Sequence, residues 1–577
     1  MKRANKILNS IDKILKSSEF HVIPLKTYNF NHMKKIGILL IAALLFSTSC
    51  EDYLKEDNRS SITTDEFYAT QGGYESLVNA CYSTLRELYT DMNIDNDDQK
   101  NVSSMQGLTL LGTDLFCYAK KADQNDIMDG YFLLTPDHNW VANVFSNCYK
   151  AIQLHHLALD WEDKTVQFDA LPLRVAEVRF LRAYFYHVLV EMYGAVTIVE
   201  EAFNQPVTSF ERDSEEEVYA FIINELEAVK NILPAQAQDG GRATKGAAEH
   251  LLSLVYLSRG YTSFAAADDF EKAEQNATSV IESGTYNLLP SFESVFEPGN
   301  EENREIIFAI QYDRNSMING IGGHNAHSWG GLFAGNAAGM PYRHGQIRPT
   351  DQCYLQFDKD DKRYSASFMV NQYDPYYDYY DDSKPEEDKV ISQVYPHASI
   401  VNDPENPSPP NWVFLDEYTV WVPSNEEWED DNYPWVKKFD DPLAVTRSDN
   451  SRDFFLFRLA ETYLIRAEAK IKQGKSGDDD INAVRARSWD IPSEGAGIDD
   501  LLDERGRELL GECKRWMDLR RTGKIIERVS MYNHAVKRYL DQGYEPFGPQ
   551  NGKALKRPIP TDAIIRDGGD YGQNVGY

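Results

Sequence analysis

The sequence lacks the short signatures of the common catalytic sites. It contains no HExxH, no GxSxG and no GxGxxG that opens a strand–helix unit, so it gives no support for a zinc protease, an α/β-hydrolase or a dinucleotide-binding enzyme. The GKS at 474–476 has Ala469 where a phosphate-binding loop needs glycine, and it joins two expected helices instead of following a strand. We therefore expect no catalytic residue and no cofactor.

Cysteine is scarce, with six residues in 577, and none of the spacings is CxxC or typical of a zinc site. Setting Cys50 aside leaves five, an odd number that argues against a full disulfide framework. We predict that most of these five are buried free thiols.

Positive charge is in deficit, since 59 Lys and Arg face 91 Asp and Glu for a net charge of −32. Residues 1–49 hold eight bases and two acids, so removing that +6 segment leaves −38. A surface that follows nucleic-acid phosphates is excluded by this charge, and a neutral or cationic ligand fits better.

The apolar run from Ile36 to Phe46 is too short to span a bilayer but has the length of a signal-peptide core. It follows Met33 and two lysines, and it leads through small residues into Cys50. The pattern resembles a bacterial lipobox, in which the chain is cut before the cysteine and the thiol is acylated. We predict a signal peptide over 1–49, lipidation of Cys50 and a polar tether over 50–60. Translation starts at Met33, or the signal peptide has a long N-terminal region.

Apolar residues at steps of three and four predict helices along much of the chain. The expected helices are 61–89, 140–159, 173–194, 214–234, 244–260, 269–290, 453–474, 478–489 and 498–524. The pair 244–260 and 269–290 has about the length of a tetratricopeptide repeat. Residues 305–312 alternate like a strand, and long irregular insertions are expected at 90–140 and 310–450.

A series of ordered motifs resembles the SusD/RagB family of outer-membrane nutrient-binding lipoproteins. The motifs are EVRFLRAYFYHVLVEMYG (177–194), PTDQCYLQFDKDDKR (349–363), RLAETYLIRAEA (458–469), INAVRARS (481–488), DERGRELLGECKRWMDLRRTGK (503–524) and RPIPTDAIIRDGGDYGQNVGY (557–577). The resemblance covers residues 50 to 577.

This resemblance implies a mainly α fold, in which tetratricopeptide-like helix pairs form a right-handed superhelical scaffold. The N-terminal helical region would span 61–300 and the C-terminal region 301–577, with ligand loops over 310–450. Members of the family are not enzymes. They are lipid-anchored on the outer face of the outer membrane, where they cap a SusC-type TonB-dependent transporter and pass it oligosaccharides or, in some members, peptides.

Two segments correspond to the ligand loops of the family, 111–132 and 324–345. Sugar rings expose apolar C–H faces that stack on aromatic rings, while polar side chains bind the hydroxyls. The predicted stacking residues are Trp329 and Tyr342, with Tyr118 and Tyr131 opposite, and the predicted hydrogen-bonding residues are Asp114, Asn325 and Arg343.

Three alternatives stay open. The Tyr-rich, acidic loop 373–381 suits a cationic peptide, and the abundant carboxylates leave room for a surface glycosidase. Residues 91–102 resemble the start of a calcium loop, but Asn96 stands where glycine belongs and Val102 where glutamate belongs. That segment favours a solvated acidic loop, with weak calcium binding as the alternative.

Four large side chains on the periodic C-terminal helices are interpreted as scaffold and not as ligand contacts. They are Trp489, Trp516, Arg520 and Arg521.

Overall fold

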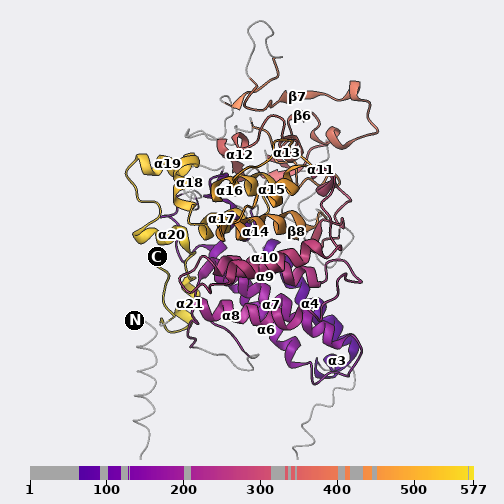
Figure 1. Cartoon of the computed structure of the whole chain (residues 1–577), viewed down its shortest axis with the longest axis vertical. Coiled ribbons are helices and arrows are strands. Elements are labelled where there is room, and N and C mark those ends of the chain that lie inside the picture. Colours follow the sequence, from indigo (N-terminus) through magenta and orange to yellow (C-terminus); the bar gives the residue numbers. More distant parts are fainter. Residues whose placement is uncertain are drawn as a thin grey trace, which may run out of the picture. The chain divides into compact units, whose positions relative to one another are not determined.

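The computed structural model describes most of the chain (Figure 1). The described residues are 64–90, 102–118, 128, 130–200, 209–313, 332–334, 339–344, 347–400, 410–415, 433–444, 451–569 and 571–577. Contacts divide the chain into residues 1–66 and 67–577, and the architecture below is that of the second unit. The predicted signal peptide, Cys50, the tether and all of the calcium-like segment except Val102 lie outside the described residues.

In the described residues, nine helices that pack on one another in sequence order build the scaffold. They are α4 (Gln71–Thr90), α6 (Asn139–Asp160), α7 (Leu171–Tyr193), α8 (Glu215–Val229), α9 (Lys245–Arg259), α10 (Asp269–Glu282), α14 (Leu459–Lys472), α15 (Asp478–Arg485) and α16 (Ile498–Glu508). Contacts run from α4 to α6, on through α7, α8, α9 and α10, and then to α14, which holds α15 and α16 (Figure 1). This order confirms the expected mainly α fold of stacked helix pairs.

Shorter helices complete the described part of the chain. They are α3 (Thr64–Tyr68), α5 (Ser104–Leu110), α11 (Phe292–Val295), α12 (Asp351–Leu355), α13 (Arg363–Ser367), α17 (Arg515–Arg521), α18 (Ile525–Tyr532), α19 (His534–Asp541), α20 (Gly552–Leu555) and α21 (Thr561–Arg566). Among the described residues, no helix is both long enough and apolar enough to cross a membrane.

Local sequence signals explain where several helices begin and end. Ser214 and Glu217 form a capping box at the start of α8, and the Thr244 side chain caps α9. Gly194 ends α7 with φ of 77°, a conformation that favours glycine. Almost every side chain of α7 from Val175 onward is buried, as expected for a helix covered on all sides.

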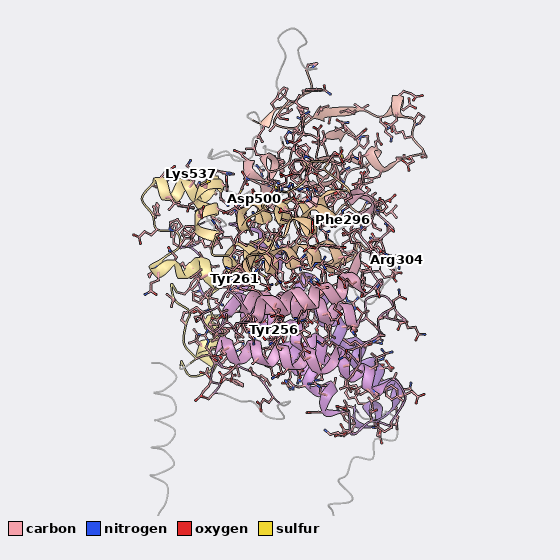
Figure 2. All side chains as sticks on the ribbon, in the orientation of Figure 1. Tyr256, Tyr261, Phe296, Arg304, Asp500 and Lys537 are labelled. Carbon is pink, nitrogen blue, oxygen red and sulfur yellow. The ribbon has the colours of Figure 1, made fainter. Side chains whose placement is uncertain are left out.

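Tyr256 and Tyr261, which are labelled in Figure 2, contact cations where α9, α10 and α14 pack together. The ring of Tyr256 on α9 lies 5.4 Å from the Arg259 guanidinium and 5.5 Å from the Lys272 ammonium of α10. Tyr261, which follows α9, lies under Lys472 of α14 at 4.5 Å. These contacts join three consecutive elements of the scaffold.

The expected helix 453–474 is wrong over its first residues. Phe454–Arg458 form strand β8, which pairs antiparallel with β2 (Ile306–Ile310), the strand expected from the alternation at 305–312. All five residues of β8 are buried. Apolar and polar residues therefore do not alternate along it, as they would in a strand with one exposed face. Its partner lies about 150 residues earlier, which local periodicity cannot reveal.

Two other expected helices are interrupted. The segment 498–524 divides into α16 and α17 because Gly511 and Cys513 take φ of 76° and 59° between them. The segment 61–89 divides into α3 and α4 at Thr70, whose hydroxyl accepts a hydrogen bond from the Gly73 amide at 3.0 Å.

A buried network of ion pairs joins the motifs that carried the family resemblance. Arg458 contacts Glu508 at 2.7 Å and Glu305 at 3.0 Å, and Arg363 contacts Glu508 at 3.1 Å and Glu504 at 2.7 Å. Burial opposes ionisation of Glu504, but the guanidinium groups of Arg363 and its neighbours lower its pKa to about 2. The charged motif residues are therefore interior supports of the fold.

The four residues interpreted as scaffold do pack within it. Trp516 is fully buried against Arg557, whose guanidinium lies 4.2 Å from its ring. Arg520 pairs with Glu191, and Arg521 with Glu468 at 2.8 Å.

The Trp489 ring lies 4.7 Å from the guanidinium of Arg485.

The prediction about the thiols is also confirmed, because all five cysteines of the described residues are free and buried.

Candidate ligand-binding face

The described parts of the insertion 310–450 contain short regular elements where only irregular chain was expected. They are β3 (Leu332–Ala334), β4 (Tyr342–His344), β5 (Ile347–Pro349), α12, α13, β6 (Asn371–Tyr373), η3 (Tyr376–Tyr380), η4 (Glu386–Asp388) and β7 (Ile391–Val394). In Figure 1, β6 and β7 lie at the upper end of the view, beyond α12 and α13 and away from α6 to α8.

Strand pairing brings the two expected ligand-loop segments together. β1 (Phe116–Tyr118) of the first segment pairs with β5, so that Tyr118 lies opposite Ile347. β5 begins three residues after β4, which pairs with β3 and sets Arg343 opposite Phe333. Tyr118 therefore pairs with a strand that begins three residues after the strand of Tyr342 and Arg343.

The structure places Asp114 in the core. Its carboxylate accepts hydrogen bonds from Arg515 at 2.6 and 2.7 Å and from Arg528 at 2.8 Å. Burial would raise the pKa of Asp114, but the two guanidinium groups hold it below the usual value. Asp114 therefore fastens the first loop segment to α17 and α18, and this corrects its assignment as a ligand contact.

Tyr131 and Tyr118 are also buried, and this corrects their assignment as stacking platforms. Tyr131 is 0% exposed, donates its hydroxyl to the Gly112 carbonyl at 2.6 Å and packs on Phe547. Tyr118 is 4% exposed in β1. Aromatic residues of this type fill cores as readily as they line binding sites, and the sequence carries no sign that separates the two uses.

The other predicted site residues stay predictions. Trp329 and Asn325 lie outside the described residues. Tyr342 and Arg343 are placed by their backbone in β4, and the described part of the structure does not extend to their side chains.

A second aromatic surface lies beside the chain that leads into β4. It belongs to the loop 373–381, which the sequence linked only to a cationic peptide. Four half-buried tyrosines of β6 and η3 form it, and we call them the tyrosine platform: Tyr373, Tyr377, Tyr379 and Tyr380. Adjacent rings meet at an angle, with centroids 4.8 Å apart for Tyr379 and Tyr380 and 5.9 Å for Tyr373 and Tyr379. The repeated tyrosines of YDPYYDYY are the signal that could have located it.

Buried polar groups fix the tyrosines of η3. One oxygen of the buried Asp440 carboxylate accepts the hydroxyls of both Tyr376 and Tyr380 at 2.8 Å, and the Asp441 carbonyl accepts that of Tyr377 at 2.9 Å. The Tyr376 ring stacks on Trp435, with centroids 5.1 Å apart. Because these hydroxyls are held from beneath, the rings are ordered before any ligand arrives.

A lysine supports Tyr379 from the interior. The Lys437 ammonium lies 4.0 Å from the centroid of the Tyr379 ring and donates a hydrogen bond to its hydroxyl, with Glu293 of α11 at 3.5 Å. Burial lowers the pKa of Lys437, and Glu293 opposes that shift. The cation is therefore part of the support of the platform.

The platform touches the chain that leads into β4. The Tyr377 amide donates to the Gly339 carbonyl at 2.8 Å, and Met340 packs on the same cluster of aromatic residues. A Cβ on Gly339 would lie 2.5 Å from Pro375, so this contact requires glycine. Two residues after Met340 comes Tyr342, which sets the predicted stacking residue near the four tyrosines.

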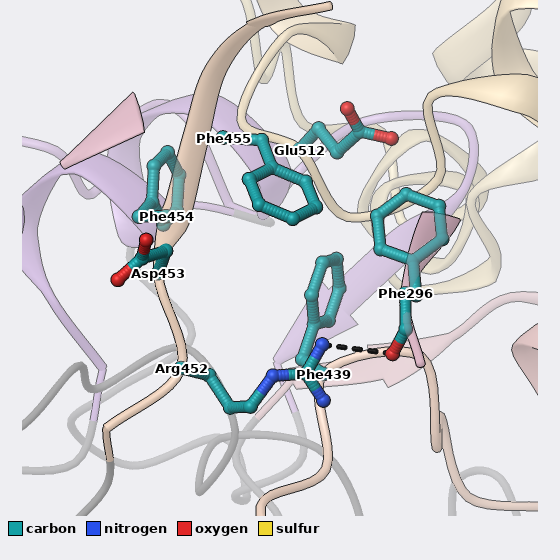
Figure 3. Close-up of a pocket in the computed structure, with 7 residues that line it drawn as sticks. All are labelled: Phe296, Phe439, Arg452, Asp453, Phe454, Phe455 and Glu512. Atoms are coloured by element: carbon teal, nitrogen blue, oxygen red, sulfur yellow. Dashed lines mark hydrogen bonds between the residues drawn. The ribbon is translucent and has the colours of Figure 1, made fainter. Parts of the chain in front are cut away.

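Cavities elsewhere include two open clefts of about 410 and 300 Å³, one along α6 and α7 and one beside α4, and an enclosed cavity that is too small for a sugar. The enclosed one in Figure 3 lies between Phe296, Phe439 and Phe455, and its volume of about 20 Å³ holds at most one water molecule. Arg452 closes one side by donating to the Phe296 carbonyl at 2.8 Å. Within the described ranges, no three His, Cys, Asp or Glu side chains converge as metal ligands.

Models of two protein families match the chain. A model described as starch-binding associating with outer membrane matches residues 52–257, and a model described as SusD family matches residues 304–577.

Characterised relatives match over most of their length. The starch-binding protein SusD of Bacteroides thetaiotaomicron is 27% identical over 457 residues, which is 74% of this chain and 76% of that protein. SusD-like protein P25 of Formosa agariphila is 23% identical over 86% of this chain and 92% of its own.

Solved structures share the fold. A laminarin-binding SusD-like protein has a TM-score of 0.63 at 20% identity, covering 88% of this chain and 100% of that one. Surface glycan-binding protein A of Bacteroides thetaiotaomicron in complex with laminarihexaose has a TM-score of 0.64 at 17% identity, with the same coverage. At this identity the two structures show a common fold and nothing about shared ligands.

Proposed function

The chain belongs to the SusD family, and from this premise we propose that it captures oligosaccharides at the outer surface of the outer membrane. Members of the family are binding proteins and not enzymes, so the glycosidase alternative is set aside. The proposal includes a lipid anchor on Cys50 and delivery of the ligand to a SusC-type TonB-dependent transporter.

The observation that carries the proposal is the tyrosine platform. Its rings are half-exposed, ordered from beneath and adjacent to the hairpin that bears Tyr342 and Arg343. Sugar rings stack their C–H faces on such surfaces, and nearby carboxylates accept hydrogen bonds from the hydroxyls. A relative named for binding starch supports the same ligand class.

A peptide is the second candidate ligand, favoured by one observation. Exposed carboxylates at Asp381, Asp382 and Glu387 follow the platform directly, and they would attract a cationic peptide that packs its apolar side chains on the rings.

The test is affinity electrophoresis in native gels that contain soluble starch or laminarin. We expect the wild-type protein to be retarded, and Tyr373→Ala and Tyr379→Ala each to weaken binding about tenfold, which corresponds to about 1.4 kcal/mol. Tyr544→Ala is the matched control, because Tyr544 is a half-exposed tyrosine in the C-terminal part of the chain that stacks on Phe132.

Unaltered retardation of both platform variants, with their folds intact by circular dichroism, would remove the platform from the binding site. Retardation by neither polysaccharide, together with binding of a lysine-rich peptide, would favour the peptide alternative.

A further inference from the structure

We propose that the tyrosine platform selects uncharged glycans and rejects polysaccharides that carry carboxylate or sulfate groups. The inference rests on the proposed function, because it specifies which class of glycan the same site accepts. It follows from the distribution of charge around the four rings.

The segment that forms the platform and its flank is strongly acidic. Residues 371–390 contain seven carboxylates and two lysines, for a formal charge of −5. Five of the carboxylates are on exposed residues after η3: Asp381, Asp382, Glu386, Glu387 and Asp388. An anionic sugar that stacks on the rings would therefore meet a field of its own sign.

The cations of the segment already have carboxylate partners. Lys384 pairs with Asp378 at 2.5 Å and Lys389 with Glu386 at 2.6 Å. Lys437 faces the ring of Tyr379 from the interior and has Glu293 at 3.5 Å. An anion that used any of these lysines would have to displace an existing partner.

The whole insertion 310–450 also has more acidic than basic residues. Residues 310–450 contain 24 Asp and Glu against 11 Lys and Arg. Its net charge of −13 is about two-fifths of the −32 of the whole chain, in about a quarter of its residues. The formal charge of the whole insertion therefore has the same sign as that of residues 371–390.

The hydroxyl groups of a neutral sugar interact favourably with the same carboxylates. A carboxylate is an acceptor with several lone pairs, so it takes hydrogen bonds from the hydroxyls of a neutral sugar. The charged group of a uronic acid or sulfate ester is itself a hydrogen-bond acceptor, so it cannot donate to the carboxylates. It also adds Coulomb repulsion, which salt screens beyond the Debye length of about 10 Å at 0.1 M salt. The same carboxylates thus assist one ligand class and oppose the other.

The test compares soluble starch and laminarin with their carboxymethylated forms in affinity gels or by calorimetry. At about 0.01 M salt, where the Debye length is about 30 Å, we expect each carboxymethylated polymer to bind at least about tenfold more weakly than its parent. At about 1 M salt, where the Debye length is about 3 Å, we expect the difference to shrink to about twofold or less.

A variant isolates the charge. Asp382→Asn, Glu387→Gln and Asp388→Asn combined should tighten binding of the carboxymethylated polymers several-fold at low salt and should not tighten binding of the neutral parents. The matched control is Asp163→Asn, Glu282→Gln and Glu494→Gln, which removes three exposed acids elsewhere on the chain and should change neither.

The outcomes separate the two claims. Equal binding of parent and carboxymethylated polymers at low salt, a difference that does not respond to salt, or preferential binding of the anionic forms would overturn the inference while carbohydrate binding stood. If none of the four polymers binds, the proposed function fails and the inference fails with it.

Discussion

At the scale of single residues, the same type of side chain has different roles when it is buried and when it is exposed. Asp114 is neutralised by two guanidinium groups in the core, whereas Asp382 is exposed beside the tyrosine platform. Tyr131 fills the interior, whereas Tyr379 is half-exposed on a fixed support. Burial and partners decide the role, and neither can be read from residue type.

Asp453 gives a pH-dependent prediction at this scale. It lies beside the small cavity of Figure 3 and accepts the Tyr312 amide at 2.9 Å. Burial, aided by Glu301 and Glu302, raises the pKa of Asp453 to about 7. A carboxyl group with a raised folded-state pKa binds its proton more tightly when folded, so its contribution to stability is lost as the pH rises from about 4 to about 7.

Asp453→Asn keeps the acceptor oxygen and removes the titration. We therefore expect it to raise the free energy of unfolding by about 1–3 kcal/mol at pH 8 relative to wild type, with little difference near pH 4. Urea denaturation at the two pH values measures this. A variant that shifts stability equally at both would contradict the assignment.

At the scale of elements, the amphipathic helices lie where the spacing of apolar residues predicted them. The predictions from sequence were wrong where the chain turns or where a strand pairs with a distant segment. Leu181 and Val188 of α7 and Leu85 of α4 are buried as expected. β8 was mistaken for helix because its pairing partner is distant in sequence. The split between α16 and α17 depends on two residues with positive φ.

That split gives a prediction about backbone conformation. Gly511→Ala should lower the free energy of unfolding by about 1 kcal/mol or more, because φ of 76° is strained for a residue with a Cβ. Gly72→Ala in α4 is the matched control: its added Cβ meets nothing within 4 Å, and alanine favours a helix, so stability should be unchanged or slightly higher. Equal effects of the two changes in thermal melts would refute the argument.

At the scale of the whole molecule, the helical scaffold carries two loop segments in separate insertions, since 111–132 precedes α6 and 324–345 follows α10. β1 and β5 pair across more than two hundred residues, and Asp114 is tied to α17 and α18. The proposed ligand face is thus held by contacts between the two halves of the chain. A rigid support of this kind lowers the entropic cost of binding.

Membrane attachment gives the prediction at this scale. Cys50→Ala should abolish labelling with a radioactive fatty acid and release the protein from the membrane fraction, because acyl chains provide the anchor. Acidic residues directly after the lipidated cysteine resemble the tag that sends such lipoproteins to the cell surface. Glu51→Ala with Asp52→Ala should therefore stay anchored but face the periplasm, which protease treatment of intact cells would reveal as protection. Membrane retention of the unlabelled Cys50→Ala protein would contradict the lipobox interpretation.

Much of this architecture was predictable and much of the ligand face was not. Helix positions follow from apolar spacing and caps, as at Ser214 and Thr244, since those signals lie within a few residues of one another. Asp114, Tyr118 and Tyr131 were misjudged because burial depends on what packs on a side chain from elsewhere in the chain.

Composition and local patterns were enough to predict the helical class, the family and the net negative charge. Each of these depends on composition or on patterns within one element. Only the tertiary structure decided that the motif arginines support the core and that the tyrosines of η3 are held over Asp440 and Trp435 beside β4. Those relations join residues far apart in the chain, and they exist only once the helices have packed.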